Sequence, residues 1–267
     1  MREDIRVGIA GYGAIGRAVG VALLKGIPGV RLAAIGVRRG VERPAPGVAP
    51  GVAVMAAELL AEHADVVVEC APAAALSGIA APVLRAGKTM VVLSCGALLR
   101  LPELEALARA HGGRILVPTG ALLGLDAVLA AAEGVITRVQ MITRKPPGGL
   151  AGAPHLVAHG IDVSGLTAPL LVFSGTAREA AIGFPANVNV AAALAMAGVG
   201  PDRTMIDIWA DPALTRNIHR IELESDAARI ELQIENVPSE NPKTGRITAQ
   251  SVVALLRKMG APLAIGT

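Results

Sequence analysis

The stretch Arg6-Val-Gly-Ile-Ala-Gly11-Tyr-Gly13-Ala-Ile-Gly16 joins a short β-rich run to an alanine-rich helical run. In a G-x-G-x-x-G pattern between a strand and a helix, the first glycine allows a tight turn. The second lets the backbone approach a pyrophosphate, and the third lets the helix lie close to the strand. The N-terminus of the helix adds N–H donors and positive potential. The pattern predicts a dinucleotide site, the alternative being a glycine-rich turn without a ligand. The expected cofactor contacts here are Gly11, Gly13, Ala14, Ile15 and Gly16.

Short β-rich runs and helical runs alternate along the first 120 residues. This alternation is typical of an α/β fold of the Rossmann type, a doubly wound parallel sheet with helices on both faces. The expected strands are Ile5–Ile9, Val30–Ile35, Val66–Glu69, Thr89–Leu93 and Arg114–Val117. The expected helices are Ala14–Lys25, Ala56–Glu62, Ala73–Arg85 and Leu101–Ala110. We therefore assign residues 1–120 to a dinucleotide-binding domain.

The pattern changes after residue 120, where strands follow one another with fewer helices between them. This change predicts a second, α+β domain over residues 121–240, with a mixed or antiparallel sheet that carries the substrate and the catalytic group. Its expected strands are Thr137–Thr143, Thr204–Ala210, Asn217–Glu224 and Arg229–Glu235. Start and stop signals predict a last helix over about Thr244–Met259. We expect residues 241–267 to pack back on the first domain.

The composition excludes several classes of protein. The 267 residues are 52% hydrophobic and 18% charged, which is too apolar for a disordered chain. The longest uncharged stretch, 180–201, contains Pro185 and two asparagines, so we interpret it as a buried segment and expect no membrane span. The net charge of +3 comes from scattered arginines, which argues against nucleic-acid binding. The N-terminus lacks a signal-peptide pattern, and we expect a cytoplasmic protein.

The end of the second predicted strand bears on the choice of cofactor. An NAD enzyme usually offers a carboxylate to the ribose hydroxyls there, but this chain has Arg38 and Arg39. Two guanidinium groups suit a ribose 2′-phosphate, which arginine can bind with two parallel hydrogen bonds. We therefore favour NADP, with NAD as the other candidate and two solvated arginines as the alternative interpretation.

Further strand ends should border the same crevice, because ligands of such sheets bind beyond the carboxyl ends of the strands. Small residues are common in turns, so each position has an ordinary structural explanation as well. The expected cofactor contacts at these strand ends are Cys70, Ala71, Ser94, Gly96, Gly120 and Ala121.

One histidine of the second domain is a candidate catalyst. Period-two alternation along residues 217–224 puts His219 on the inward face at the start of a strand, although an inward histidine is also a common core residue. Asp211 lies upstream and is able to orient it if the two side chains meet. Asn187 and Asn189 lie where a helix begins, either as caps or as amide donors to a nicotinamide. No cluster has the spacing of metal ligands, so we expect no metal.

Several motifs together resemble the L-aspartate dehydrogenase family over nearly the whole chain. They are Gly11-Tyr-Gly-Ala-Ile-Gly16, Thr119-Gly-Ala-Leu-Leu-Gly-Leu-Asp126, Lys145-Pro-Pro-Gly-Gly-Leu150, Phe184-Pro-Ala-Asn-Val-Asn-Val-Ala-Ala192, Asp211-Pro212, Asn217-Ile-His219 and Pro238-Ser-Glu-Asn-Pro-Lys-Thr244. The resemblance implies that His219 is the catalytic histidine and that Asn187 contacts the cofactor or the substrate. The chain departs from the family pattern at Leu122-Leu123 and at Gly245.

The resemblance also implies a reaction, in which hydride leaves the α-carbon of L-aspartate for the nicotinamide and the imine is hydrolysed to oxaloacetate and ammonia, or the reverse. The ammonium must first lose a proton, a task for the neutral imidazole of His219. We expect Lys243 and Thr244 to bind the distal carboxylate. A homo-oligomer and a role in NAD biosynthesis are further implications. The alternatives are an NADP-linked reductase of the homoserine or dihydrodipicolinate type, and a nucleotide-sensing protein without catalysis.

Overall fold

The computed structural model describes residues 3–38, 51–186, 188–237 and 245–266. The chain forms two compact units. The first consists of Met1–Pro118 together with Thr248–Ile265, and the second of Thr119–Ile247 together with Gly266–Thr267. Each unit has its own β-sheet.

The sheet of the first unit has six strands in the order β3-β2-β1-β4-β5-β6, and all its neighbouring pairs are parallel. Its strands are β1 (Ile5–Ala10), β2 (Val30–Val37), β3 (Ala53–Ala56), β4 (Val66–Glu69), β5 (Thr89–Val92) and β6 (Arg114–Leu116). This order reverses at β1, which is the arrangement of a Rossmann-type sheet. The predicted fold class and all five strands predicted for this half are confirmed.

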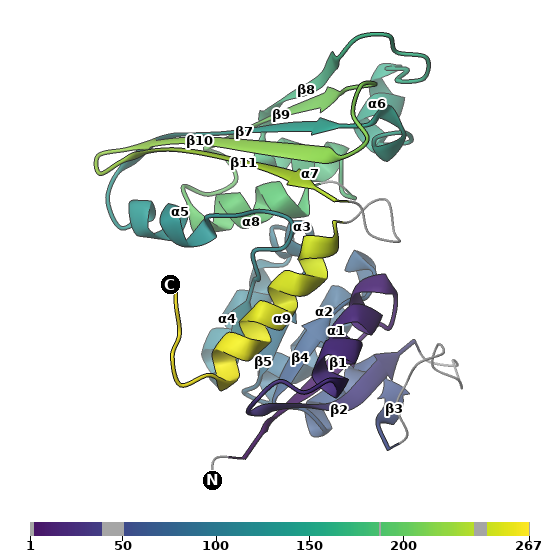
Figure 1. Cartoon of the computed structure of the whole chain (residues 1–267), viewed down its shortest axis with the longest axis vertical. Coiled ribbons are helices and arrows are strands. Elements are labelled where there is room, and N and C mark those ends of the chain that lie inside the picture. Colours follow the sequence, from purple (N-terminus) through teal and green to yellow (C-terminus); the bar gives the residue numbers. More distant parts are fainter. Residues whose placement is uncertain (1–2, 39–50, 187, 238–244, 267) are drawn as a thin grey trace. The chain divides into compact units, whose positions relative to one another are not determined.

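Helices pack on both faces of this sheet, because successive side chains of a strand point to opposite faces and both sets are apolar. Val7 and Ile9 of β1 share one core cluster with residues of α1 and α9, whereas Ala10 belongs to the opposite cluster with residues of α2 and α4. The helices concerned are α1 (Ala14–Leu24), α2 (Leu76–Arg85), α4 (Pro102–His111) and α9 (Arg246–Gly260). Figure 1 shows α9, from the far end of the chain, running across the face that α1 also covers. Buried Val252 and Leu256 hold it there.

The first unit differs from the sequence-based expectation in four elements. The edge strand β3 was not predicted, because it is only four residues long and follows a stretch rich in proline and glycine. Residues 57–62 form a 3-10 helix, η1 (Ala57–Glu62), and not the expected α-helix. The helix expected over Ala73–Arg85 begins as the 3-10 turn η2 (Ala73–Ala75), and a short helix α3 (Cys95–Leu98) follows β5. Short elements such as these have too few residues to show a periodicity.

The sheet of the second unit has five strands in the order β11-β10-β7-β9-β8. Its strands are β7 (Ile136–Lys145), β8 (Leu170–Thr176), β9 (Thr204–Ala210), β10 (Asn217–Ser225) and β11 (Arg229–Asn236). Strands β7 and β9 are parallel and the other pairs antiparallel, so the sheet is mixed, which is one of the two predicted arrangements. Strand β8 was not predicted, because it lies at the edge with a bulge between Leu171 and Phe173 and so lacks a regular alternation.

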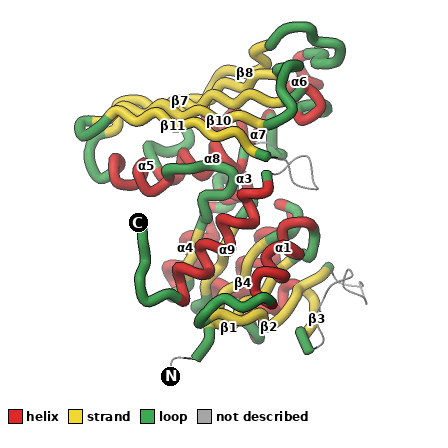
Figure 2. The backbone as a smooth tube through the Cα atoms, in the orientation of Figure 1, coloured by secondary structure: helices red, strands yellow, loops and turns green. Residues whose placement is uncertain are grey.

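One face of the second sheet is covered by helices. Figure 2 shows α5, α7 and α8 on the same side of the strands. The helices of this unit are α5 (Leu125–Ala132), α6 (Pro154–His159), α7 (Ala177–Gly183) and α8 (Asn189–Ala197). Thr176 caps α7 through a reciprocal capping box with Glu179, which satisfies donors at the start of that helix. The covered face is the one on which His219 lies buried.

The single tyrosine and the single tryptophan of the chain lie in different units. Tyr12, within the glycine-rich loop of the first unit, is buried and packs so closely on α1 that a Cβ at Gly20 would lie 2.7 Å from its hydroxyl. Trp209 on β9 of the second unit is half-buried, with the guanidinium carbon of Arg144 5.2 Å from its ring centroid.

Among the described residues, no helix is long and apolar enough to cross a membrane.

Candidate active site

The glycine-rich loop of the first unit has the geometry that a dinucleotide site requires. Gly11 has a φ of +92°, and a Cβ there would lie 2.7 Å from the carbonyl oxygen of Cys70. A Cβ at Gly16 would overlap the carbonyl oxygen of Gly11, so α1 approaches the loop too closely for any side chain. Gly13 caps α1 and has nothing within 4 Å of its Cβ position. A cradle therefore lies open at the N-terminus of α1, next to Ala14 and Ile15.

The parallel register brings the other predicted cofactor contacts of this unit to the same edge of the sheet. Ala10 pairs with Gly36 on one side and with Glu69 on the other, and Glu69 pairs with Val92. The loops that follow these strands therefore lie together at the carboxyl edge. The predicted contacts in those loops are Arg38, which is exposed, Cys70 and Ala71, which are half-buried, and Ser94 and Gly96, which are buried. Arg39 lies outside the described residues.

A buried carboxylate that sequence reasoning missed holds this edge together. Glu69 ends β4, and its carboxylate accepts hydrogen bonds from the N–H groups of Leu93 and Ser94 at 3.1 and 2.9 Å. The Ser94 hydroxyl donates to it as well, at 3.0 Å. Burial raises the pKa of Glu69, although these donors favour its charged form. Its position as the one charged residue in the apolar run Val66–Glu69 was the available signal. We infer that it positions the loop after β5.

The two cysteines of this edge are not activated nucleophiles. Burial raises the pKa of the Cys70 thiol, and it raises the pKa of Cys95 to about 12, with the charge of Glu69 adding to both shifts. A thiol of such high pKa has almost no thiolate at neutral pH. The cysteines are therefore small, inert residues of the sheet edge.

In the second unit, His219 lies in a row of side chains that crosses the covered face of the sheet. It pairs with Ile234 of β11 on one side and with Thr143 of β7 on the other, and Thr143 pairs with Ile208 of β9. Only 3% of His219 is exposed, which confirms the predicted inward face. The Oγ1 of Thr143 lies 3.1 Å from Nδ1 of the imidazole.

Asp211 does not fill the orienting role that its position in the sequence suggested. Its carboxylate accepts a hydrogen bond from the N–H of Ala213 at 3.0 Å and pairs with Arg144 at 3.4 Å. Thr143 is the residue that contacts the His219 ring. Thr143 lies 76 positions from His219, so only the strand register shows their contact.

A buried lysine accompanies His219 on this face. Lys145 ends β7 two residues after Thr143, and only 5% of it is exposed. Burial lowers the pKa of Lys145 to about 8. Burial, and to a smaller extent the charge of Lys145, lowers the pKa of His219 to about 3, well below the ordinary value of 6.5 for histidine. The imidazole is therefore neutral throughout the physiological pH range.

Asn236 is a further buried polar residue on the face of the sheet that carries His219. It ends β11 opposite Asn217, and its amide donates a hydrogen bond to the carbonyl oxygen of Ala121 at 3.1 Å. Ala121 and Gly120, both predicted cofactor contacts, belong to this second unit. The buried Oδ1 of Asn236 has no hydrogen-bond donor among the described residues. Buried acceptors are seldom left unsatisfied, so this atom is a candidate contact for a ligand.

Besides Arg39, three predicted site residues lie outside the described residues: Asn187, Lys243 and Thr244. Asn189 begins α8, whose N-cap is Val188, so the capping interpretation of Asn189 is not supported. In the described part of the chain, no group of three or more His, Cys, Asp or Glu side chains is arranged to bind a metal ion.

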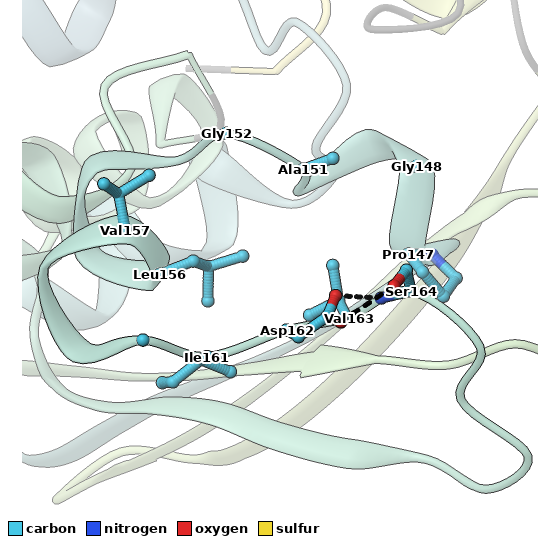
Figure 3. Close-up of a pocket in the computed structure, with 11 residues that line it drawn as sticks. Pro147, Gly148, Ala151, Gly152, Leu156, Val157, Ile161, Asp162, Val163 and Ser164 are labelled. Carbon is cyan, nitrogen blue, oxygen red and sulfur yellow. Dashed lines mark hydrogen bonds between the residues drawn. The ribbon is translucent and has the colours of Figure 1, made fainter.

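A separate hollow of about 430 Å³ lies beyond the loop that follows Lys145. Figure 3 shows Leu156, Val157 and Ile161 lining it, together with the hydrogen-bonded pair Asp162 and Ser164. The described residues that line it do not include His219 or the polar residues beside it. Its lining is mostly apolar, which does not suit a charged substrate.

Comparisons with known proteins agree with this geometry. The family model for the C-terminal part of aspartate dehydrogenase matches residues 126–259, and the model for the NAD-binding domain of homoserine dehydrogenase matches residues 11–118. An L-aspartate dehydrogenase of Bordetella bronchiseptica is 57% identical over 276 residues, covering 100% of this chain and 99% of that protein. The chain belongs to the aspartate dehydrogenase family. It is therefore an oxidoreductase with a domain that binds a nicotinamide dinucleotide.

Two further relatives of the family support this assignment. L-aspartate dehydrogenase of Bradyrhizobium diazoefficiens is 56% identical, with 99% of this chain and 95% of that protein covered. The crystal structure of aspartate dehydrogenase from Thermotoga maritima matches with a TM-score of 0.74 and 25% identity, covering 99% of this chain and 100% of that one. A homoserine dehydrogenase structure, at 13% identity and a TM-score of 0.57, shares the fold alone.

Proposed function

We propose that this member of the aspartate dehydrogenase family oxidises L-aspartate with a nicotinamide cofactor, giving oxaloacetate and ammonia through iminoaspartate, and catalyses the reverse reaction. The contact between Thr143 and His219 carries the proposal, because it orients a buried neutral imidazole beside a buried lysine. Relatives named L-aspartate dehydrogenase, 56 and 57% identical over almost the whole chain, support it.

The residues present in the first unit fit a dinucleotide. The open space at Gly13 and the N–H groups at the start of α1 suit a pyrophosphate, and Gly11 and Gly16 set the shape of the loop. A bound nicotinamide would supply the hydride acceptor, or the donor in the reverse direction. We propose that Cys70, Ala71, Ser94, Gly96, Gly120, Ala121 and Asn187 complete the cofactor site.

The proposed cofactor preference depends on the arginines that follow β2 in the sequence. Arg38 follows directly on β2, where the ribose of the cofactor lies in this fold, and it is exposed. A guanidinium there favours a 2′-phosphate, and Arg39 would add a second positive charge. We propose that NADP is preferred and that NAD binds more weakly.

His219 is the proposed general base. Its Nε2 accepts a proton from the ammonium group of aspartate, which frees the lone pair that forms the C=N bond as hydride leaves the α-carbon. For Nε2 to accept, Nδ1 must carry the ring hydrogen and donate it to Thr143 Oγ1, which lies 3.1 Å away. After it releases that proton, the same nitrogen is able to deprotonate the water that attacks the imine carbon.

The lowered pKa of His219 has two consequences for this step. With a pKa of about 3 in the protein without substrate, the imidazole is neutral, which is the form that a base requires. The same shift opposes protonation, so efficient proton transfer needs additional negative charge nearby. The carboxylates of aspartate supply that charge when they bind. We propose that Lys243 and Thr244 bind the distal one.

A turnover assay tests the proposed function. Purified protein is mixed with oxaloacetate, ammonia and either NADPH or NADH, and the absorbance of the reduced nicotinamide is followed. We expect oxidation of the cofactor that requires both oxaloacetate and ammonia, and reduction of the oxidised cofactor by L-aspartate. Cofactor binding without a change that depends on the amino acid would favour a nucleotide sensor, and turnover of homoserine in place of aspartate would favour the other reductases.

The assembly and the cellular setting are also proposals. We expect a cytoplasmic homo-oligomer with a role in NAD biosynthesis. Large apolar side chains that are exposed on the second unit, among them Val157 and Ile182 at 73 and 69%, support self-association. Light scattering on the purified protein measures the oligomeric state directly, and a monomer at all concentrations would contradict it.

A further inference from the structure

The buried cation beside His219 has no role in the mechanism described so far. Lys145 lies on the same covered face as Thr143, because side chains two positions apart on a strand point to the same side. Thr143 pairs with His219, so Lys145 is one step along the sheet from the imidazole. Its charge acts on His219 strongly enough to contribute to the lowered pKa of that ring. The two side chains are therefore close neighbours in a site of low exposure.

We propose that the ammonium group of Lys145 binds the α-carboxylate of the amino-acid substrate. This inference rests on the proposed aspartate dehydrogenase function and names the residue that recognises one part of the substrate. A buried ammonium and a carboxylate form a charge-assisted hydrogen bond, which is among the stronger polar contacts in proteins. The Oδ1 of Asn236 has no donor among the described residues, and it lies at the end of β11, which pairs with the strand of His219. It is a candidate acceptor for the substrate ammonium.

The position of Lys145 selects the α-carboxylate over the distal one. His219 acts on the nitrogen of the α-carbon, and the α-carboxylate is bonded to that same carbon. Lys145 is two residues after Thr143, whose Oγ1 lies 3.1 Å from the imidazole, and it points to the same side of β7. Its ammonium therefore lies near the carboxylate that is closest to the reacting nitrogen. The distal carboxyl carbon is two bonds from the α-carbon, one more than the α-carboxyl carbon, and other residues must hold it.

Binding at Lys145 also links recognition to proton transfer. Without substrate, the charge of Lys145 opposes protonation of His219. A carboxylate that neutralises this charge removes the opposition, so the imidazole becomes a better base when the substrate is in place. A molecule without an α-carboxylate would leave His219 a weak base even if it entered the site.

The test uses three variants of the full chain with bound cofactor. Lys145→Met keeps the length of the side chain and removes its charge, and Lys145→Arg keeps the charge. Arg138→Met, on the opposite and exposed face of β7, is the matched control, because it removes a positive charge from the same strand. The measurements are KM and kcat for L-aspartate, the dissociation constant of oxaloacetate with the oxidised cofactor, inhibition by pyruvate, and the melting temperature.

We expect Lys145→Met to raise the KM for L-aspartate and the dissociation constant of oxaloacetate by about ten- to hundred-fold. Pyruvate, which has an α-carboxylate and no distal one, should lose inhibition by a similar factor. Lys145→Arg should recover part of the binding, and Arg138→Met should resemble the wild type. The melting temperature of Lys145→Met shows whether the loss of binding is accompanied by a loss of folding.

Three results would overturn the assignment. Unchanged substrate binding in Lys145→Met would exclude the contact, and an equal loss in Arg138→Met would reduce it to general electrostatic attraction. Weaker oxaloacetate binding with unchanged pyruvate inhibition would move the contact to the distal carboxylate. If the wild type binds oxaloacetate through Lys145 but does not turn over aspartate, the carboxylate site stands and the proposed function fails.

Discussion

The imidazole of His219 has two ring nitrogens, and the described residues supply a partner to Nδ1. Thr143 contacts Nδ1 at 3.1 Å, on a face of the sheet where only 3% of the histidine is exposed. A histidine in this setting is either a general base oriented by a hydroxyl or a core residue satisfied by it. The two interpretations make opposite predictions for turnover and stability, so single substitutions are able to separate them.

Removal of the imidazole tests the role of His219 directly. We expect His219→Ala to fold and to bind NADPH with unchanged affinity, because the glycine-rich loop belongs to the other unit. Its kcat should fall by about 10²–10⁴-fold, the usual effect of losing a positioned base. Melting temperature, cofactor affinity and kcat are measured on one preparation. A variant that is less stable but turns over at close to the wild-type rate would make His219 a core residue.

We expect the Thr143 hydroxyl to affect catalysis by selecting the tautomer of His219. Thr143→Val preserves the shape of the side chain but leaves a buried ring N–H without an acceptor, an unfavourable change of about 1–3 kcal/mol. We expect the ring to adopt the other tautomer and kcat to fall by about ten-fold or more, with cofactor affinity unchanged. Thr143→Ser keeps the hydroxyl and should retain most of the activity. Full activity in the valine variant would remove Thr143 from the mechanism.

The preference for NADP over NAD should depend on the positive charges of Arg38 and Arg39, which follow β2 in the sequence. Changing Arg38 and Arg39 together to glutamine should weaken NADPH binding by about ten- to hundred-fold, because each guanidinium–phosphate contact is charge-assisted. NADH lacks the 2′-phosphate and should bind as before. Fluorescence titration of both cofactors measures the ratio. Equal losses for the two would mean that the arginines do not recognise the phosphate.

At the scale of elements, two glycines of the loop between β1 and α1 are needed for different reasons, one for cofactor binding and one for packing. Gly13 has open space around its Cβ position, whereas a Cβ at Gly16 would overlap the backbone of Gly11. We therefore expect Gly13→Ala to keep its melting temperature and to lose cofactor affinity, since the added methyl group occupies the cradle. Gly16→Ala should lose stability as well, because α1 must move away from the loop. A destabilised Gly13→Ala would show that the space is not open in solution.

The elements also show what a sequence reveals and what it conceals. The glycine pattern and the alternation of strands and helices predicted the doubly wound sheet, since both are local and repeated. The edge strands β3 and β8 were missed, because short or bulged strands show no periodicity. The inward position of His219 followed from period-two alternation in its own strand.

The partners of His219 were not accessible from the sequence in the same way. Thr143 and Lys145 meet it across a strand register, which no spacing along the chain reveals. Lys145 also resembles an ordinary solvated lysine until its burial is known. Glu69 was closer to being predictable, since a carboxylate at the end of an apolar strand needs partners.

At the scale of the whole molecule, the neutral buried histidine links stability to pH. The pKa of His219 is about 3 when folded and near 6.5 when unfolded, so between these values the unfolded chain binds one more proton. Stability should therefore fall as the pH decreases below about 6.5, by up to about 1.4 kcal/mol per pH unit from this group. The group contributes no such loss above that value.

Urea unfolding at several pH values tests this link, with His219→Gln as the comparison. The variant lacks the titrating ring, so its stability should fall less steeply in acid than that of the wild type. Glu69, whose pKa is raised by burial, titrates with the opposite sign, but it is present in both proteins and cancels in the difference. Parallel pH profiles would mean that His219 is hydrated and protonated in the folded protein.

Tyr12 and Trp209 make the two units separately visible to spectroscopy. The phenol is buried in the first unit and the indole lies half-buried on the second sheet, and each is the single residue of its kind in the chain. Selective excitation of the indole therefore follows the second sheet alone, whereas the near-ultraviolet signal of the phenol follows the loop between β1 and α1. Coincident denaturation curves from these two native chromophores would reveal one cooperative transition, and separated curves would reveal units that unfold independently.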